Sequence, residues 1–189
     1  MFVLVIGPSG CGKNTIIEAI LTKFDGKIAV LPSFTTRNIR PGEVDGKFYC
    51  FISFDEFLKR IDNKEFIEYE KVHANGNYYG VSKVKYDEYS KIYPMLIKDV
   101  DVHGVANIKK QGYDTLTIYI DVPYEELKQR LKVRGESDEE IELRLKRKEH
   151  EDSFKQSCDY IVENIDLNKA INDVETIIKK EMDKRNIGF

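Results

Sequence analysis

The chain has 189 residues, of which 41% are hydrophobic and 33% are charged, a balance typical of a water-soluble folded domain with a sizeable core. The net charge of -3 argues against bulk attraction to nucleic acid or to a membrane surface, and no apolar run approaches the roughly 20 residues of a membrane-spanning helix. We therefore expect a cytoplasmic protein that binds neither nucleic acid nor membrane, and any phosphate binding must come from local basic clusters.

The first elements follow the order strand, loop, helix, strand. The continuous apolar run Phe2–Ile6 predicts a strand buried on both faces of a parallel sheet. A glycine-rich turn follows, and apolar residues then recur at helical spacing from Ile16 to Leu21. Ile28–Leu31 predicts a short second strand that Pro32 ends. Strand, glycine loop and helix in this order form one half of a βαβ unit.

Residues 33–85 interrupt this rhythm and predict an inserted, mostly β lobe. Lys47–Ser53 and Phe66–Val72 are expected as short strands with partly polar faces. Between them, Ser53 and Glu56 have the spacing of a capping box, and apolar residues then recur as on an amphipathic helix.

The alternation of strands and helices returns after residue 86. Strands are expected at Pro94–Val100, Thr115–Asp121 and Tyr160–Glu163, and helices at Val102–Lys110, Tyr124–Val133, Ser137 to about Gln156, and the C-terminus. Gly112 is expected to end the first of these helices, and Ser137 and Glu140 form a second capping box.

A phosphate-binding loop is predicted between the first strand and the first helix. Its residues are Gly7, Pro8, Ser9, Gly10, Cys11, Gly12 and Lys13, which fit G-x-x-x-x-G-K. Glycines let the backbone aim several N–H groups at phosphate oxygens, and the helix N-terminus adds partial positive charge. Lys13 is expected to bridge the β- and γ-phosphates of ATP.

The position after the lysine usually carries a hydroxyl that binds Mg²⁺. Here it is Asn14, with Thr15 next. An amide oxygen is a weaker ligand, so we expect Mg²⁺ near Asn14 without direct coordination by that residue.

The remaining cysteines and histidines show no metal or disulfide pattern. The chain contains Cys11, Cys50, Cys158, His73, His103 and His150. The cysteines are widely spaced, which favours free thiols in a reducing compartment, and the histidines lack metal-ligand spacing.

A second phosphate site is predicted in the inserted lobe. Arg37 and Arg40 lie three residues apart and are followed by Tyr49. Guanidinium forks pair bidentately with phosphate oxygens, and a phenol adds a neutral donor. These three side chains are therefore a candidate clamp for an acceptor phosphate.

The whole chain resembles the guanylate kinase family of P-loop nucleoside monophosphate kinases. The resemblance is carried, in the family's order, by Ser33–Phe51, Phe66–Tyr69, Asn77–Gly80, Asp99–Gly104, Arg130–Gly135, Arg144–Leu145 and Asn164. It implies a three-layer α/β fold with a parallel sheet core, an inserted mostly β GMP-binding lobe and a small helical lid. The implied segments are core 1–32, lobe 33–85, core 86–125, lid region 126–155 and core 156–189.

The resemblance also implies an activity and a role for each matching residue. The activity is transfer of the γ-phosphate of Mg·ATP to GMP, and also to dGMP, by a monomer or homodimer. The implied ATP-binding residues are Gly7, Pro8, Ser9, Gly10, Cys11, Gly12, Lys13, Asn14, Thr15, Arg130, Arg134 and Asn164. The implied GMP-binding residues are Ser33, Arg37, Arg40, Tyr49, Glu68, Tyr79 and Asp101. The implied catalytic residues are Lys13, Arg37, Arg134 and Arg144, and Asp99 is a candidate to reach Mg²⁺ through water.

Three positions depart from the family pattern. Val81 stands where a hydroxyl usually contacts the guanine carbonyl, and Ser82 could replace it only if the backbone shifts. Lys98 replaces an apolar residue and His103 replaces a glutamine, and neither has a role that follows from the sequence. A deoxyguanylate preference or relaxed base selectivity stays open, as do a ribose-bisphosphate kinase and a non-catalytic protein-binding module.

Overall fold

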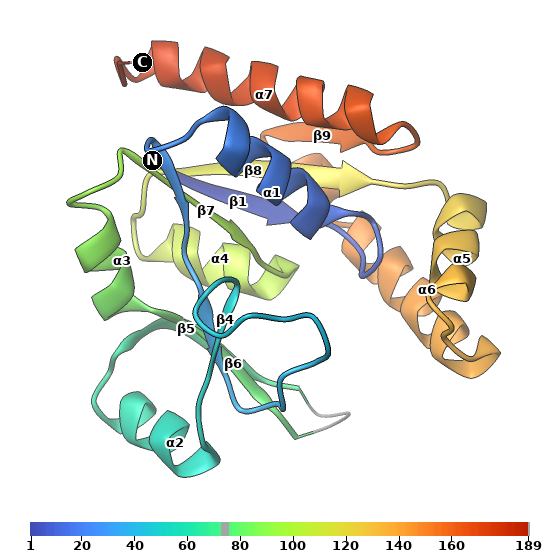
Figure 1. The fold of residues 1–189 in the computed structure, drawn as a ribbon, viewed down its shortest axis with the longest axis horizontal. Coiled ribbons are helices and arrows are strands. Elements are labelled where there is room, and N and C mark those ends of the chain that lie inside the picture. The colour runs from blue at the N-terminus through green and yellow to red at the C-terminus, as the bar shows by residue number, and fades with distance from the viewer. Residues whose placement is uncertain (73–75, 189) are drawn as a thin grey trace.

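The computed structural model describes residues 1–72 and 76–188, so His73 lies outside the described residues. Its central sheet contains β1 (Phe2–Ile6), β2 (Ile28–Val30), β7 (Met95–Asp99), β8 (Thr115–Asp121) and β9 (Tyr160–Glu163) in the order β2-β7-β1-β8-β9 (Figure 1). Every pairing in it is parallel. The carboxyl ends of the strands therefore share one edge, where ligands bind in folds of this kind.

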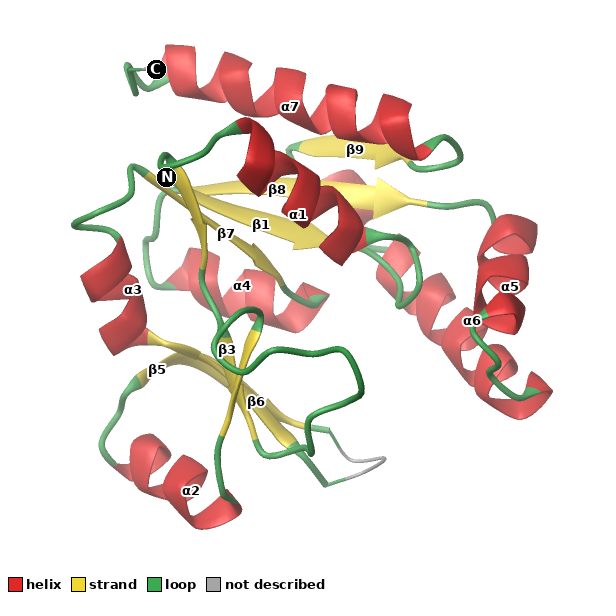
Figure 2. Ribbon diagram, viewed as in Figure 1, coloured by secondary structure: helices red, strands yellow, loops and turns green. Residues whose placement is uncertain are grey.

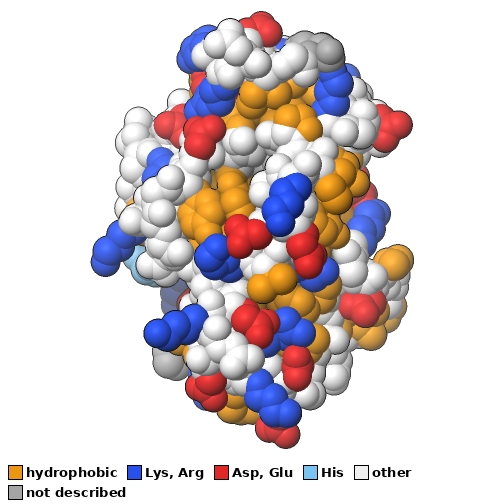
Figure 3. All heavy atoms as spheres, turned by 90° about the vertical axis from the view of Figure 1, so that its left-hand side faces the viewer, with side chains coloured by type: hydrophobic (Ala, Val, Ile, Leu, Met, Phe, Trp, Pro, Cys, Tyr) orange, Lys and Arg blue, Asp and Glu red, His pale blue; other side chains and the backbone are white. Residues whose placement is uncertain are grey.

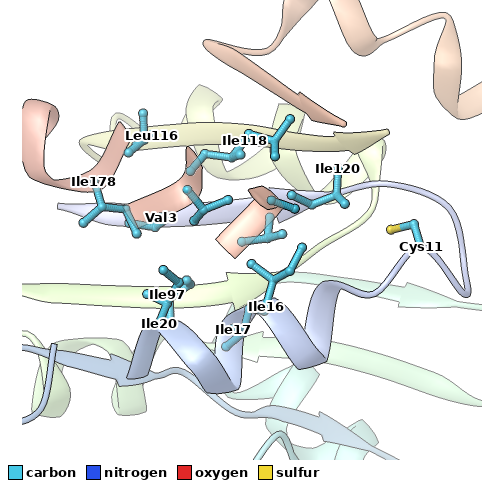
Figure 4. Close-up of a cluster of buried hydrophobic side chains, with 14 of the residues drawn as sticks. Val3, Cys11, Ile16, Ile17, Ile20, Ile97, Leu116, Ile118, Ile120 and Ile178 are labelled. Atoms are coloured by element: carbon cyan, nitrogen blue, oxygen red, sulfur yellow. The ribbon is translucent and has the colours of Figure 1, made fainter. Parts of the chain in front are cut away.

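Helices cover both faces of this sheet. The helices α1 (Lys13–Lys23) and α7 (Leu167–Lys184) lie on one face, and α4 (Val102–Lys110) lies on the other (Figure 2). Alternate apolar side chains of β1 and β8, including Val3 and Ile118, point toward Ile16 and Ile20 of α1 (Figure 4), and those between them face the other side of the sheet. Burying each such side chain stabilises the fold by about 1.5–3 kcal/mol, which explains why these strands are apolar throughout.

The inserted lobe packs on the α4 side of the central sheet. Its own sheet has the order β4-β3-β6-β5, formed by β3 (Ser33–Thr35), β4 (Tyr49–Phe51), β5 (Phe66–Lys71) and β6 (Tyr78–Ser82). The helices α2 (Phe54–Asp62) and α3 (Lys83–Tyr89) complete it. Ile67 and Val81 of the lobe share a buried cluster with Leu4 and Ile6 of β1.

A pair of helices projects from the core on the other side of the β1–α1 loop from the inserted lobe. These are α5 (Tyr124–Val133) and α6 (Asp138–Asp152), followed by a 3₁₀ turn at Lys155–Ser157 (Figure 1). The Ser137–Glu140 capping box is confirmed. Lys148 is buried and pairs with Asp121 at the end of β8, so α6 is tied to the sheet by an ion pair.

The surface carries both signs of charge. On the face shown in Figure 3, Lys and Arg side chains alternate with Asp and Glu, between small groups of apolar side chains. Within the described residues, the model holds no helix that combines the length and apolarity needed to cross a bilayer.

The sequence predicted most elements, with differences at particular ends. Ser53 caps α2 through the N–H of Glu56, but the Glu56 carboxylate pairs with Arg60, so the predicted reciprocal capping box is wrong. The strand expected at Lys47–Ser53 is confined to Tyr49–Phe51, and the long charged helix ends at Asp152 rather than near Gln156. The elements β3, β6 and α3 were not predicted.

Candidate active site

The loop between β1 and α1 is shaped by glycine and supported by Asn164. Gly12 has φ of 95°, and a Cβ there would lie 2.5 Å from Nδ2 of Asn164. That Nδ2 donates to the carbonyl of Cys11 at 2.7 Å. Asn164 follows β9 directly, so the end of this strand holds the loop in place. A side chain at position 12 would break the hydrogen bond between Asn164 and Cys11.

The loop presents donors at the start of α1. The first N–H groups of a helix have no partner within the helix, and the helix dipole places partial positive charge there. Lys13 begins α1, and its Nζ donates to the carbonyls of Gly7 at 2.5 Å and Pro8 at 3.1 Å. The ammonium therefore lies over the loop, where a phosphate would meet it.

A cavity of about 890 Å³ extends from this loop to the lobe. Predicted residues on its wall are Ser9, Gly10, Gly12, Lys13, Asn14, Thr15, Arg37, Arg40, Tyr49, Arg130, Arg134 and Asn164. We call it the donor cavity. Its five Lys and Arg side chains face three acidic ones, Glu43, Asp99 and Glu126. This excess of positive charge suits a polyphosphate.

Three predicted ATP-site residues lie off this wall. Gly7 lines a neighbouring cavity, Cys11 is fully buried, and Pro8 contributes its carbonyl to Lys13. Their backbones shape the loop, which is what the motif requires of them.

Arg37 is 8% exposed and forms an ion pair with Glu43. The sequence did not predict this partner. The guanidinium donates to both carboxylate oxygens, at 2.7 and 2.6 Å, and stands 4.8 Å from the centre of the Tyr49 ring. Glu43 also accepts the backbone N–H of Arg40 at 2.8 Å. The hydrogen bonds from Arg37 hold the pKa of the Glu43 carboxyl below its ordinary value. The carboxylate thus occupies a fork whose geometry also matches phosphate.

A second cavity, of about 260 Å³, adjoins the first under the lobe. It contains the predicted residues Ser33, Tyr49, Glu68, Tyr79 and Asp101, together with Glu70, Lys98, Asp99 and Glu151. We call it the acceptor cavity. Ser9, Lys13, Tyr49 and Asp99 line both cavities, so these four residues mark where the two meet.

The acceptor cavity is acidic, and its carboxyl groups influence one another. Burial, reinforced by the charge of Asp101, raises the pKa of Glu68 to about 7. A hydrogen bond with Asp101, together with burial, raises the pKa of Glu70 to about 7. Burial also raises the pKa of Glu151, whose Oε2 has no hydrogen-bond partner within the described residues. These groups are poised to accept hydrogen bonds from a ligand that carries N–H donors.

Gly104 makes room for this arrangement. Asp101 caps α4 by accepting the N–H of Gly104 at 2.7 Å. A Cβ on Gly104 would lie 3.3 Å from both the Asp101 carboxylate and the Glu68 carboxyl carbon. The absence of a side chain therefore lets β5 bring Glu68 against the start of α4, where the helix dipole favours a carboxylate.

Asp99 lies at the junction of the cavities and is ionised. Burial acts to raise the pKa of its carboxyl, but Lys98 and Lys13 outweigh burial and hold the pKa below its ordinary value. The hydroxyl of Tyr49 donates to Asp99 at 3.5 Å, and this charge, with burial, raises the pKa of Tyr49 well above its usual range. Tyr49 is therefore a neutral donor at neutral pH.

The arginines of the helical segment reach the loop in different ways. Arg144 donates to the hydroxyl of Ser9 at 2.5 Å and pairs with Glu136, but it lies on neither cavity wall. Arg130 donates to Glu126 and to the carbonyl of Asn164, both at 2.8 Å. Arg134 ends α5 and lines the donor cavity.

The positions that depart from the family pattern have definite surroundings. Val81 is fully buried in the cluster between lobe and core. The hydroxyl of Ser82 accepts the N–H of Lys85 and so caps α3, and the residue is buried and lines neither cavity, which disfavours the substitution for position 81 considered above. His103 lies beside His150, with ring centres 5.9 Å apart, and outside both cavity walls.

Oxygen ligands suited to Mg²⁺ line the donor cavity. Asn14, Thr15 and Asp99 all line the donor cavity, and these are hard ligands of the kind that Mg²⁺ prefers. Within residues 1–72 and 76–188, no three His, Cys, Asp or Glu side chains cluster as a metal site. The residues fit an ion that keeps water ligands and arrives with phosphate, rather than one held in a protein cage.

Glu43, Glu70 and Glu151 were not among the predicted site residues, although the sequence carried a signal for two of them. Glu70 is two residues after Glu68 on β5, and alternate strand residues face the same side. Glu151 is seven residues after Arg144 on α6, which places both on one helix face. Glu43 carried no such signal, because its partner Arg37 reaches it through a loop.

Comparisons with known proteins agree on one family. The family model described as guanylate kinase matches residues 1–181. The guanylate kinase of Thermotoga maritima is 37% identical over 183 residues, which cover 96% of this chain and 87% of that protein. The guanylate kinase of Bartonella henselae is 38% identical over 189 residues, covering 98% of this chain and 83% of that protein.

Solved structures show the same likeness. The crystal structure of guanylate kinase from Anaplasma phagocytophilum superposes with a TM-score of 0.72 at 26% identity, covering 96% of this chain and 85% of that one. The shikimate kinase of Bacteroides thetaiotaomicron shares the fold, with a TM-score of 0.51 at 15% identity over 95% of this chain and 98% of that one.

Proposed function

The chain belongs to the guanylate kinase family, and on this basis we propose that it transfers the γ-phosphate of ATP to GMP, and also to dGMP, giving ADP and the nucleoside diphosphate. The observation that carries the proposal is the meeting of two unlike cavities. A basic cavity built on the glycine loop adjoins an acidic cavity rich in hydrogen-bond acceptors, and Lys13 lines both.

ATP is assigned to the donor cavity. The backbone N–H groups of the loop and the start of α1 bind its phosphates, and Lys13 turns from the loop carbonyls to the β- and γ-phosphates. Arg130, Arg134 and Asn164 also line this cavity, and we assign the nucleoside of ATP to their side of it.

The base of GMP is assigned to the acceptor cavity, and its phosphate to the junction, toward Lys13 and the arginines of the donor cavity. Arg37, Arg40, Tyr49 and Tyr79 bind the phosphate, which competes with Glu43 for the Arg37 fork. Glu68 and Asp101 accept from the ring N–H and the amine of guanine, and Ser33 donates to its carbonyl. Adenine lacks these paired donors and would leave buried carboxyl groups unsatisfied, which disfavours it.

Transfer is in-line and needs no covalent intermediate on the protein. Catalysis is alignment of the two phosphates and neutralisation of the charge that spreads over the transferred group. Lys13, Arg37, Arg134 and Arg144 supply that positive charge. Residues 126–155 act as the lid: Arg144 already contacts the loop through Ser9, and closure would exclude water.

Mg²⁺ accompanies ATP in this proposal. Asn14, Thr15 and Asp99 line the donor cavity and would hold the ion, Asp99 through water. When bound, the ion neutralises charge on the β- and γ-phosphate oxygens. We assign the protein to the cytoplasm. The intact loop and the carboxyl-rich acceptor cavity favour neither a protein-binding module nor a ribose-bisphosphate kinase.

A coupled assay tests this function. Purified protein is supplied with Mg·ATP and, in turn, GMP, dGMP, IMP, AMP and UMP, and ADP release is followed. We expect turnover with GMP and dGMP and little with AMP or UMP. Arg37→Ala should lower kcat/KM for GMP on the order of 10²-fold, by analogy with arginines in other phosphoryl transfers. Equal turnover of GMP and AMP would contradict the base assignment, and an unchanged Arg37→Ala variant would contradict the phosphate assignment.

A further inference from the structure

Lys98 is a buried cation that the mechanism above does not use. It lies on β7, is 3% exposed and lines the acceptor cavity. Strand residues alternate between faces, and Leu96, two positions earlier, belongs to the cluster on the lobe side of the sheet. The Lys98 side chain therefore points from the floor of the sheet toward the lobe.

The ammonium has few partners for its depth. Its one hydrogen bond among the described residues is to the adjacent Asp99, at 3.3 Å, and it stands 5.8 Å from the centre of the Tyr49 ring. An ammonium carries three N–H donors. A buried donor left without an acceptor is unfavourable, so the site has spare hydrogen-bonding capacity directed at a ligand.

The neighbouring groups indicate which part of a ligand this capacity suits. Lys98 is close enough to Glu68 for its charge to lower the pKa of that carboxyl against the effect of burial. Ser33 begins β3 two residues after Leu31, whose N–H bonds to the carbonyl of Ile97, so the chain passes from the core sheet to Ser33 close to the end of β7 that carries Lys98. Donors on Ser33 and Lys98 thus stand next to an acceptor on Glu68, and all three line one cavity.

The strand on the other side of the cavity supplies no side-chain donor at this level. Val81 pairs with both Ser33 and Glu68 across the lobe sheet, and its side chain is apolar and buried. Ser82 is buried, lines neither cavity, and its hydroxyl accepts the N–H of Lys85 at the cap of α3. A carbonyl group bound near Ser33 would therefore find its second donor on the core sheet, and Lys98 is the residue placed there.

We propose that the Lys98 ammonium donates a hydrogen bond to the carbonyl oxygen of the acceptor base, while Glu68 accepts from the neighbouring ring N–H. This inference rests on the proposed function and deepens it, because it names Lys98 as a specificity-determining residue. A hydrogen bond from a charged donor is about twice as strong as a neutral one, so its loss should change affinity on the order of 10- to 100-fold.

A comparison of two substrates in two proteins isolates this contact. GMP and 6-thio-GMP share the ring N–H, the amine and the phosphate. They differ at one atom: the carbonyl oxygen of GMP is replaced in 6-thio-GMP by sulfur, which is a poor hydrogen-bond acceptor. In the wild type, kcat/KM should favour GMP. In Lys98→Met, which fills the space without a donor, this preference should fall by about 10-fold or more, because only the GMP reaction loses a strong hydrogen bond.

Two further variants complete the design. Lys148→Met removes a lysine of similar burial that pairs with Asp121 and Asp152 and lines neither cavity, and the substrate preference should stay at the wild-type value. Lys98→Gln keeps an N–H donor at the same depth and should retain an intermediate preference, which provides the measurement if Lys98→Met does not accumulate as folded protein.

The outcomes separate this inference from the proposed function. An equal loss of kcat/KM for both substrates in the Lys98 variants would overturn the inference, because Lys98 would then act on the phosphate or on packing. A wild-type protein that phosphorylates neither substrate would overturn the proposed function itself.

Discussion

Replacing Glu68 by Gln should stabilise the protein without ligand at alkaline pH and have no effect on stability at acidic pH. The side chain lies in the acceptor cavity, where burial and Asp101 raise the pKa of its carboxyl from 4.5 to about 7. Because the folded pKa lies above the unfolded one, the folded protein holds an extra proton between these values. The free energy of unfolding therefore decreases as the pH rises through this window and stays low above pH 7.

The size of the effect follows from the same values. A displacement from 4.5 to about 7 corresponds to about 3 kcal/mol, and partial exposure reduces the expected effect to about 2 kcal/mol. For a chain of this length, 1 kcal/mol moves Tm by about 2–4 °C. Glutamine resembles the protonated carboxyl group and does not titrate. At pH 8 the Tm of Glu68→Gln should exceed that of the wild type by about 4–8 °C, and at pH 5, near the start of the window, the difference should shrink to about 1–2 °C.

Thermal unfolding followed by circular dichroism at both pH values is the assay. Glu142→Gln, on the exposed face of α6, is the control and should match the wild type at both. If Glu68→Gln differs from the wild type by the same amount at pH 5 and pH 8, the reasoning about the buried carboxyl fails. The same variant should lose activity with GMP, since a stabilising change at a strained site commonly impairs function.

Two further substitutions test the packing around the site. Gly104→Ala places a methyl group 3.3 Å from the Glu68 carboxyl carbon, so KM for GMP should rise on the order of 10-fold while KM for ATP stays unchanged. Steady-state kinetics with each substrate varied in turn measures both constants. A rise in KM for ATP as well as for GMP would mean that the contact is misassigned. Asn164→Ala removes the hydrogen bond to Cys11 that holds the loop, so the free energy of unfolding should fall by about 1–3 kcal/mol and KM for ATP should rise, as measured by urea unfolding and kinetics. A stable variant with wild-type ATP kinetics would mean that the glycine loop keeps its shape without Asn164.

The sequence predicted the core better than the lobe for a physical reason. In the core, each element carries its own signal: Phe2–Ile6 is apolar because both faces of β1 are buried, and Ser137 and Glu140 satisfy the start of α6 by themselves. The lobe depends on longer-range packing. A Cβ on Gly80 of β6 would lie 2.7 Å from the ring of Phe66, so this glycine serves close packing between strands and not the turn that glycine usually indicates.

The candidate site divides in the same way. Motif residues such as Lys13 and Arg37 could be assigned from spacing, because a phosphate-binding loop and an arginine pair are local patterns. The partners that set their charge could not. Glu43 meets Arg37 in a loop, and the role we propose for Lys98 arises only when the lobe is folded over β7 and encloses its ammonium.

The opposed charges of the two cavities determine which way round a nucleotide binds. A phosphate placed beside Glu68 and Glu70 would add an anion to a cavity where burial raises the pKa of Glu68 and a hydrogen bond with Asp101 raises the pKa of Glu70. A base placed on Arg37 would leave the guanidinium without an anionic partner once Glu43 was displaced. Only the orientation with the base among the carboxyl groups and the phosphate toward Lys13 satisfies both ends. We therefore propose that the acidic residues assist phosphate transfer as well as base selection, because they disfavour every orientation in which the acceptor phosphate points away from ATP.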